Sequence, residues 1–473
     1  MHTDCNAERM EFQALGRRAV VGCFDGGPMT SDAGGLLLRE VEARTGILEQ
    51  FSACFVDHRH ADLIEHTVAD LIAQRVYALA LGYEDLNDHD RLRGDPLLAT
   101  LVGKADPLGA DRKARRDQGK ALAGKSTLNR LELTPPDADS ASRYKKIVLD
   151  PEAVDRFFVD VFLAAHTRAP DRIVLDVDAT DDPLHGEQEG RFFHGYYGNY
   201  CYLPLYIFCG DHLLCARLRC SNQDGAAGAQ EELARIVGQI QQAWPQTQIV
   251  IRADSGFCRE DLMAWCEATA GVEYCLGLAR NTRLASSIED ELRQAMQQYQ
   301  ETGRAARVFK DFSYQTRKSW SRARRVIAKA EHLPKGANPR FIVTSFSPEA
   351  FPGRALYEEL YCARGEMENR IKEQQLDMFA DRTSASLMRA NQIRLWLSSV
   401  AYTLMQTLRR IALRGTKMAR AQCATIRVRL LKIGARVRVS VRRVFISLPR
   451  AAPAQEIFAI ALRNIQRFAP MRC

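Results

Sequence analysis

The feature that most constrains the fold is an ordered run of strand-like and helix-like segments in the middle of the chain. Three strand-like segments come first, and helices then alternate with strands. In chain order these segments span 172–180, 201–209, 213–219, 229–244, 248–254, 259–268 and 274–279. Only Gly-Asp-His separates the second strand from the third, which predicts a hairpin. The order predicts an α/β fold with a mixed sheet flanked by helices.

This order of elements is that of the RNase H-like fold. That fold places one acidic residue on its first strand and another directly after its fourth strand. Here the positions fall on Asp176 or Asp178, and on Asp254. Asp176 and Asp178 share a face of the strand because they are two residues apart, so the order alone leaves both open. Asp254 ends an apolar strand and precedes Ser-Gly, which favours a functional loop over a simple helix cap.

A second polar pattern, YCARGEMENRIK, places four side chains on one helical face. Tyr361, Arg364, Glu368 and Lys372 recur at intervals of three, four and four residues. A carboxylate surrounded by two cations and a phenol suits the binding of a metal ion together with a phosphodiester. The simpler interpretation is an ordinary ion pair between Arg364 and Glu368 on a solvated helix.

Three distant carboxylates, Asp178, Asp254 and Glu368, would form a metal site if the fold brings them together. Carboxylate oxygens are the ligands that Mg²⁺ prefers. Two ions held about 3.5–4 Å apart would activate a water or a DNA 3′-hydroxyl and stabilise the leaving oxygen. Glu366 and Glu373 are alternative glutamates, but they lie off the face that carries Glu368.

The net charge of +8 is concentrated toward the C-terminal end. Thirteen basic residues and no acidic residue lie between Arg409 and Arg450. In IRVRLLKI and RVRVSVRRVFIS, Arg alternates with Val or Ile around Gly434, which predicts a β-hairpin with one basic face. We favour a nucleic-acid partner over a merely solvated face, because solvated faces usually interleave acidic residues. The predicted DNA contacts in this region are Arg427, Arg429, Arg436 and Arg438.

The chain is longer than one ordinary hydrophobic core requires, so several domains are expected. We predict a mainly helical, DNA-binding N-terminal region and a catalytic core in two parts, the second of which carries the glutamate helix. A β-rich insertion separates these parts, and a basic C-terminal region follows. The predicted segments are 1–166 (N-terminal), 167–285 and 347–413 (core), 286–346 (insertion) and 414–473 (C-terminal).

Several other classes of protein are excluded by composition. A content of 46% hydrophobic and 26% charged residues is typical of a folded, soluble chain. The apolar runs at 76–81 and 395–405 are too short or too polar to span a bilayer, and the first residues lack a signal-peptide pattern. We therefore expect a cytoplasmic, nucleoid-associated protein with no membrane partner. The thirteen cysteines include no CxxC pair, which favours reduced thiols over zinc ligands.

Two clusters containing histidine have a structural interpretation that we prefer to metal binding. The acidic segment 82–96, which holds His89, fits capping and turn side chains. His185 and His194 lie in a polar loop after the first strand and are expected to form hydrogen bonds there.

Six segments spread over nearly the whole chain carry a resemblance to a known family. They read GYEDLNDHDRLRGDP, LAGKSTLNRLE, LDVDATDDPLHGEQE, IRADSGF, YCARGEMENRIKE and LLKIGARVRVSVRRV. The chain resembles DDE transposases of bacterial insertion sequences that have a β-rich insertion before the catalytic glutamate. It is most similar to their thirteen-eighty group.

The resemblance implies which residues form the active site. The family's first aspartate, followed by x-Thr, falls on Asp178 with Thr180, which favours Asp178 over Asp176. The second aspartate falls on Asp254 in RADSGF, and the glutamate falls on Glu368. These three residues would be both the catalytic residues and the metal ligands.

The resemblance also implies residues that hold the DNA. Arg364 and Lys372 would bind phosphate, and Tyr361 would orient either phosphate or the glutamate helix. Related transposases have a further lysine seven residues beyond the glutamate, where this chain has Gln375. Trp320 lies among basic residues and either stacks on a displaced DNA base or packs in the core.

The function implied is that of a DNA transposase that binds terminal inverted repeats and moves an insertion sequence. It would cleave a DNA strand and transfer it to a target with two Mg²⁺ ions, with Mn²⁺ as a substitute. Its partners would be double-stranded DNA, at the terminal repeats and the target, and a second copy of the chain when two ends are paired. The alternatives are a catalytically inactive, domesticated DNA-binding regulator on the same scaffold and a stand-alone nuclease.

Overall fold

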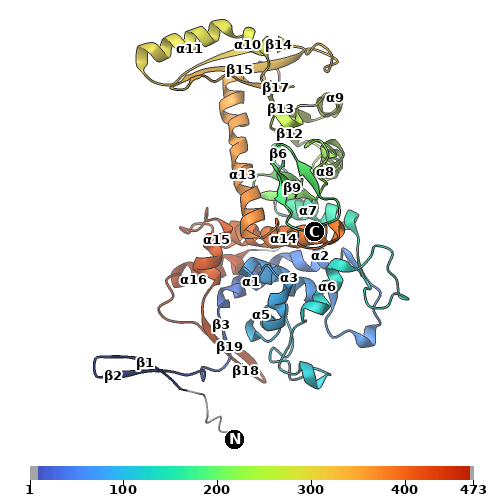
Figure 1. Cartoon of the computed structure of the whole chain (residues 1–473), viewed down its shortest axis with the longest axis vertical. Coiled ribbons are helices and arrows are strands. Elements are labelled where there is room, and N and C mark those ends of the chain that lie inside the picture. Colours follow the sequence, from blue (N-terminus) through green and yellow to red (C-terminus); the bar gives the residue numbers. More distant parts are fainter. Residues whose placement is uncertain (1–8, 469–473) are drawn as a thin grey trace. The chain divides into compact units, whose positions relative to one another are not determined.

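The computed structural model describes residues 9–468, which form two compact units (Figure 1). The first unit contains the described residues up to Leu149 and those from Val400 onward, and the second unit contains Asp150–Ser399. The sequence placed its outer segment boundaries at 166 and 413, whereas the units divide after Leu149 and after Ser399. The helix at 151–164 therefore belongs to the second unit. No helix in the described part is long and apolar enough to cross a membrane.

The second unit contains a mixed sheet, as the predicted α/β class requires. Its strands lie in the order β11-β10-β6-β12-β13-β17-β15-β14. The five that match the predicted run are β6 (Arg172–Ala179), β10 (Leu205–Cys209), β11 (His212–Arg217), β12 (Gln248–Ala253) and β13 (Val272–Leu278). β6 runs antiparallel to β10 and parallel to β12. The ends of β6 and β12 therefore lie at the same edge of the sheet.

Helices and a buried core hold this sheet together. β12 is buried on both faces, as expected of a central strand. Apolar residues of β6, such as Leu175 and Val177, share a core with Leu233 and Ile236 of the amphipathic helix α8. The helices are α7 (Pro151–Ala164), α8 (Ala229–Ala243) and α9 (Glu260–Ala268). Asp150 caps α7 by accepting hydrogen bonds from the next backbone amides, as its Asp-Pro start suggests.

Residues 286–346 are rich in strands, and these strands extend the same sheet. β17 pairs antiparallel with β13, and β15 pairs with β17 and β14. The elements are α10 (Thr282–Ser286), α11 (Glu289–Thr302), β14 (Ala306–Tyr314), β15 (Arg324–Leu333), β16 (Gly336–Ala337) and β17 (Arg340–Thr344). Trp320 is buried in the core of this region.

The helix predicted to carry the glutamate is present, but its winding is irregular. Wide π turns precede and follow the regular segment that contains Glu368, and such turns are frequent at functional sites. The pieces are α12 (Gly353–Ala355), the π segment η6 (Leu356–Tyr361), the 3₁₀ turn η7 (Cys362–Arg364), α13 (Gly365–Lys372) and the π segment η8 (Glu373–Asp377). The long helix α14 (Met388–Ile411) follows.

A small three-stranded sheet occupies the region predicted to be a polar loop after the first strand. Its order is β7-β9-β8, and both contacts are antiparallel. The strands are β7 (Asp182–Pro183), β8 (Phe192–His194) and β9 (Asn199–Tyr202). Strands of two to four residues are too short to give a clear alternation in sequence.

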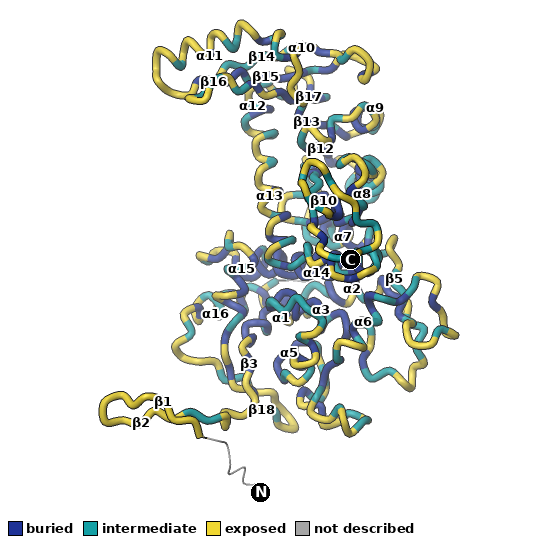
Figure 2. The backbone as a smooth tube through the Cα atoms, viewed as in Figure 1, coloured by how far each residue is buried: buried dark blue, intermediate teal, exposed yellow. Residues whose placement is uncertain are grey.

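The first unit is mainly helical. A capping box at Thr67 and Asp70 starts its central helix α3, and Gly82 ends it with a left-handed backbone. Its main helices are α1 (Leu36–Thr45), α2 (Ile47–Ser52), α3 (Val68–Leu81), α4 (His89–Leu92), α5 (Pro96–Val102), α6 (Lys125–Leu133) and α16 (Gln455–Arg467). A two-stranded sheet pairs β4 (Phe55–Asp57) with β5 (Ile147–Leu149). The hairpin of β1 (Met10–Leu15) and β2 (Arg18–Gly22) is exposed along its length (Figure 2).

The prediction of a hairpin around Gly434 was wrong for its first strand. Residues of IRVRLLKI form a helical segment, and the hairpin lies later, with its turn at Val441 and Arg442. Ile426, Leu430 and Leu431 are buried at helical spacing, which the alternation of Arg with apolar residues concealed. The elements are α15 (Cys423–Ile426), the π segment η9 (Arg427–Leu431), β18 (Ala435–Ser440) and β19 (Arg443–Ser447), and β18 also pairs with β3 (Met29–Thr30).

Candidate active site

Two of the predicted acidic residues lie side by side at one edge of the sheet. Asp178 is near the end of β6, and Asp254 directly follows β12. The parallel pairing of these strands aligns Val177 with Ala253, so the two aspartates occupy equivalent positions. Asp254 also accepts a hydrogen bond from the backbone amide of Gly256 at 2.8 Å, so it caps the next turn as well.

The third acid, Glu368, is joined to this edge through Arg364. The Arg364 guanidinium donates to Asp178 Oδ2 at 3.2 Å and to Glu368 Oε1 at 3.0 Å. The predicted ion pair within the helix is therefore present, but the same arginine also contacts the first strand. Burial lowers the pKa of Arg364, but Asp178 and the other nearby anions outweigh burial, and the net pKa is raised.

Asp178 lies in an environment that opposes its ionisation. Its pKa is raised to about 6, chiefly by burial and further by the charges of Asp254 and Glu368, while Arg364 and the amide of Ala179 lower it. The effect of Asp254 and Glu368 on the pKa of Asp178 means that the fold has brought these charges close to it. Perturbed pKa values of this origin are common at functional sites.

Asp176, the alternative first ligand, is engaged elsewhere. Its two carboxylate oxygens accept hydrogen bonds from the Arg252 guanidinium at 2.5 and 2.7 Å, and both side chains are buried. Arg252 also donates to the backbone carbonyl of Leu360, in the π segment η6 of the helical stretch that leads to Glu368. One buried guanidinium thus contacts β6 and the helix from its own position on β12. Asp176 is therefore paired with a buried cation that also contacts the helix, whereas Asp178 is paired with Arg364, which also contacts Glu368.

Gly277 is a part of the site that sequence reasoning missed. A Cβ atom on this residue of β13 would lie 2.6 Å from the Tyr361 hydroxyl and 2.8 Å from the Ser255 amide. The absence of a side chain therefore lets Tyr361 and the loop after Asp254 approach the sheet. A glycine inside a strand indicates such a close approach in general, but the partner cannot be inferred from sequence.

Gln375 occupies the position at which related transposases have a lysine, and here it is turned inward. Its amide donates to Asp182 Oδ1 at 2.8 Å and to the Asp181 carbonyl at 3.1 Å. Asp182 is fully buried, and burial together with the charges of Asp381 and Asp181 raises its pKa to about 8, although Gln375 lowers it. Gln375 therefore ties the glutamate helix to the segment after the first strand.

The remaining predicted DNA contacts of the second unit fall into two groups. Lys372 is exposed on α13, and Tyr361 is half-buried beside Arg364 and Asp254. Trp320 is buried, packs edge-to-face on Tyr314, and is covered by the Arg324 guanidinium. Of the two interpretations of Trp320, the structure supports core packing.

The predicted DNA contacts of the basic C-terminal region also divide by burial. Arg429, Arg436 and Arg438 are exposed. Arg427 is buried and donates to the carbonyl of Ala80 at 2.9 Å, near the end of α3. The prediction for Arg427 was therefore wrong, because this side chain satisfies carbonyls at a helix terminus.

The histidine clusters have structural roles in the described chain. His89 is buried, and its Nδ1 atom lies 3.0 Å from the Gln74 amide. Asp85 and Asp88 form a capping box at the start of the preceding turn. His194 lies against the ring of Tyr197 at a centroid distance of 4.9 Å. The contacts of His89, Asp85 and Asp88 agree with the capping interpretation. Among the described residues, His194 Nδ1 is buried without a hydrogen-bond partner, so the hydrogen bond expected at this nitrogen is absent.

The carboxylates of Asp178, Asp254 and Glu368 are the type of ligand that Mg²⁺ prefers, but they do not converge on one position. Among residues 9–468, no three His, Cys, Asp or Glu side chains lie close enough together to hold one metal ion. Within the same residues, Asp254 Oδ2 and Glu368 Oε2 accept no hydrogen bond, so hard oxygen donors remain available. Arg364 lies between Asp178 and Glu368 and donates a hydrogen bond to each.

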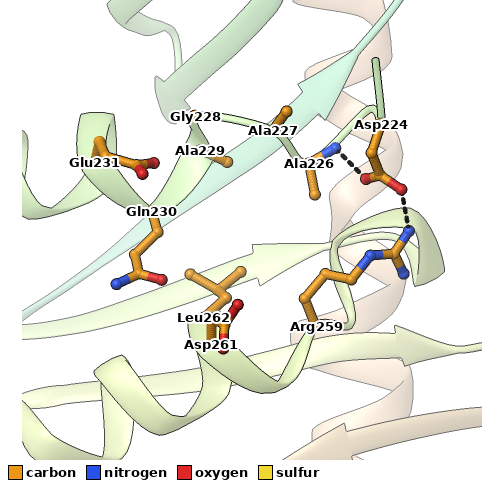
Figure 3. A pocket seen from close by; sticks show the side chains of 10 residues that line it. All are labelled: Asp224, Ala226, Ala227, Gly228, Ala229, Gln230, Glu231, Arg259, Asp261 and Leu262. Atoms are coloured by element: carbon orange, nitrogen blue, oxygen red, sulfur yellow. Dashed lines mark hydrogen bonds and ion pairs between the residues drawn. The ribbon is translucent and has the colours of Figure 1, made fainter. Parts of the chain in front are cut away.

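Two hollows lie on the second unit, and they differ in charge. One of about 460 Å³ adjoins the carboxylates and is lined by Ser255, Arg280, Arg340 and Tyr361, among others. The other, of about 370 Å³, lies at the start of α8 and is lined by acidic residues beside Arg259 (Figure 3). Its single arginine is already paired with Asp224 at 2.6 Å. Only the first hollow suits a polyanion.

Comparison with known proteins shows the family. The chain matches the family described as Transposase DDE domain group 1 over residues 12–470, and it belongs to this family. It is therefore a DNA transposase, a class of protein that binds DNA and cleaves and transfers its strands. No curated protein matches the chain.

The chain also matches a solved structure. The chain is similar to a piggyBac transposase, seen by cryo-EM in a synaptic complex with hairpin DNA. The two share 9% sequence identity over 84% of this chain and 79% of that chain, with a TM-score of 0.41. At that score the likeness carries no argument about the site.

Proposed function

We propose that this transposase cleaves and joins DNA strands with Asp178, Asp254 and Glu368 as catalytic residues and metal ligands. The single observation that supports the proposal best is that Arg364 contacts both Asp178 and Glu368, residues that are remote in sequence. Two Mg²⁺ ions, or Mn²⁺ as a substitute, would supply Lewis-acid chemistry: activation of a water or 3′-hydroxyl and stabilisation of the leaving oxygen.

The strand order supports an RNase H-like catalytic core. β6, β10 and β11 follow one another as antiparallel neighbours, and β12 and β13 then add in parallel on the other side of β6. The acids fall on the first strand and just after the fourth, as that fold requires. We regard residues 286–346 as an insertion that extends this sheet before the helix of Glu368.

The charged residues around the acids have separate tasks in this proposal. Arg364 neutralises Asp178 and Glu368 before DNA binds, and it turns to phosphate when metal ions replace it. Lys372, one helical turn beyond Glu368, binds the backbone of the DNA end. Tyr361 lies against the loop of Asp254 and orients phosphate or the helix by hydrogen bonding.

We further propose that the element moved is an insertion sequence of the thirteen-eighty group. The helical N-terminal region and the exposed arginines Arg429, Arg436 and Arg438 would recognise its terminal inverted repeats. Two copies of the chain would pair the two ends before transfer to target DNA. The protein would work in the cytoplasm, at the nucleoid.

A supercoiled plasmid that carries the element's two ends tests the catalytic proposal. With Mg²⁺, the wild-type protein is expected to nick at the ends, and Asp254→Asn is expected to lower the rate by at least about 10²-fold. Asp261→Asn removes the same charge from an exposed position on α9 and serves as the matched control. Equal nicking by wild type and Asp254→Asn would contradict the assignment.

The same plasmid distinguishes the alternatives. Tight binding of the ends without cleavage by any variant would favour a regulator on an inactive scaffold. Cleavage that is equally fast on a plasmid lacking the ends would favour a stand-alone nuclease.

A further inference from the structure

The small β8–β9 hairpin presents an aromatic face to solvent. Phe193 and Tyr200 are directly paired across the two strands, with their rings edge-to-face at 5.5 Å. The Arg191 guanidinium covers the Tyr200 ring at 4.3 Å. Phe193 is 58% exposed, Tyr200 is 45% exposed, and Tyr196 in the turn is 87% exposed. We call Phe193, Tyr196 and Tyr200 the aromatic platform.

The hairpin is held firmly at its base. The Glu189 amide donates to the Ser386 carbonyl at 2.8 Å, and the Glu189 side chain accepts from the Met388 amide at 3.0 Å. At Gly190 the backbone has a positive φ of 73°, and a Cβ atom there would lie 2.8 Å from Cys220 Sγ. The close packing at Gly190 fixes the direction in which the β8–β9 hairpin extends from the rest of the second unit.

The hairpin lies next to the candidate catalytic edge. β9 pairs with β7, which begins at Asp182, four residues after Asp178. Tyr197, in the turn of the hairpin, has a pKa raised to about 12 by burial and by the charges of Asp181 and Asp178. A DNA strand cut at Asp178 would therefore pass close to the aromatic platform.

The chemistry of the platform suits bases better than the phosphate backbone. Its nearest cation, Arg191, is already engaged with the Gly186 carbonyl and with Glu187 at 2.9 Å. Aromatic faces gain from stacking on nucleobases of any sequence, but only when those bases are unpaired. The hairpin has four exposed rings, those of the platform and that of Phe192. Four rings are few for a stable protein interface, which needs roughly 800 Å² from each partner.

We propose that the aromatic platform stacks on unpaired bases of the DNA strand adjacent to the cleaved phosphodiester. The inference rests on the proposed function, because it places that phosphodiester at Asp178. It adds a second kind of contact to the site: the platform holds bases, while Arg364 and Lys372 hold phosphates.

Binding of short DNAs tests the platform without cleavage. We compare a fluorescent fifteen-nucleotide oligo-dT with a fifteen-base-pair duplex for the full chain and for Phe193→Leu/Tyr200→Leu, which keeps apolar bulk but removes the rings. Affinity for the single strand is expected to fall at least about fivefold for each ring removed, and duplex affinity should change less than about twofold. Phe12→Leu is the control, because Phe12 on β1 is equally exposed, at 58%. An equal loss for both DNAs, or no loss, would overturn the proposal.

Cleavage then separates this inference from the proposed function. Phe193→Leu/Tyr200→Leu should cut fully paired ends slowly, and mismatches introduced beside the cleavage site should restore its rate. Phe193→Trp/Tyr200→Phe, which keeps both rings, should behave as wild type. If the wild type cuts and the Leu variant cuts paired ends equally well, only the platform is refuted. If the wild type does not cut the ends, the proposed function itself fails.

The competing interpretation is that the aromatic platform contacts a second copy of the chain. Sedimentation of the DNA-free protein tests this interpretation. The wild type and Phe193→Leu/Tyr200→Leu should have the same oligomeric state. A dimer that dissociates only in the variant would overturn the proposal and make the hairpin an interface between copies.

Discussion

Two arginine–carboxylate clusters contact β6 two residues apart, at Asp176 and at Asp178, yet their roles differ. Arg252 and Asp176 are both buried and form a bidentate pair. Arg364 is half-buried and divides its hydrogen bonds between Asp178 and the exposed Glu368. The chemistry of the groups is the same, so burial decides which cluster holds the scaffold together and which remains available for exchange with a ligand.

The largest effect should come from breaking the buried cluster. Arg252→Met leaves Asp176 buried without a cation and also removes the contact with the Leu360 carbonyl. We expect the free energy of unfolding to fall by about 3–5 kcal/mol, measured by denaturant titration. Arg364→Met should cost less than about 1 kcal/mol, because solvent reaches that cluster, although it should abolish cleavage.

A compensating variant sharpens this prediction. Arg252→Met/Asp176→Leu removes both buried charges and should recover most of the lost stability. Failure to recover would mean that the contact with Leu360, rather than the ion pair, is what stabilises this region.

The cluster of Arg364, Asp178 and Glu368 should respond to pH through Asp178. Its side chain is 17% exposed and its folded-state pKa is about 6, above the value of about 3.9 expected in an unfolded chain. The folded state therefore holds this proton more tightly, and the free energy of unfolding falls as pH rises from about 4 to about 6. Asp178→Asn should be more stable than wild type by about 2 kcal/mol at pH 8 and not at pH 4.

Asp176→Asn provides the contrast for that experiment. Burial also raises the pKa of Asp176, although Arg252 lowers it. The variant should still destabilise the protein at pH 8, because it leaves the buried Arg252 guanidinium without its counterion. The same sign of effect for both variants would contradict the division of roles between Asp176 and Asp178.

The packing around the catalytic edge can be tested at Gly277. Gly277→Ala should push Tyr361 and the loop of Asp254 away from the sheet, costing about 1–3 kcal/mol of stability and about 10²-fold in cleavage rate. Gly238→Ala on α8 is the matched control, since a Cβ atom there meets nothing within 4 Å. The control should be stabilised by about 0.5–1 kcal/mol, because alanine favours a helix over glycine.

Sequence patterns predicted the elements whose periodicity extends over many residues. α8 and β12 have strong helical and strand patterns, and both were placed within one residue at each end. The three acidic residues followed from the order of these elements and from the family resemblance, and the structure brings their charges near one another. Their roles as catalytic residues and metal ligands remain predictions.

Features that depend on neighbours in space could not be predicted. The engagement of Asp176 requires knowing that Arg252 lies beside it on the adjacent strand, and the need for Gly277 requires knowing that Tyr361 packs on it. Arg427 had the alternation of a strand but lies in a helical segment, because apolar residues at helical spacing are buried beside it. Local patterns cannot separate these cases when only a few residues carry the signal.

The smallest effect should come from Gln375→Lys, which supplies a cation to a third buried carboxylate, Asp182. Within residues 9–468 that carboxylate has no arginine partner, and its pKa is about 8, raised mainly by burial. At pH 9, where Asp182 would otherwise ionise without a counterion, the lysine should pair with it and stabilise the fold by about 1 kcal/mol. At pH 6, where Asp182 is protonated, it should destabilise by a similar amount, because a buried ammonium then lacks its partner. Gln375→Leu is the control, because it loses the hydrogen bond at both pH values. Denaturant titration measures the free energy of unfolding of each variant. A neutral Asp182 is supported only if the effect of Gln375→Lys on this free energy changes sign between pH 6 and pH 9.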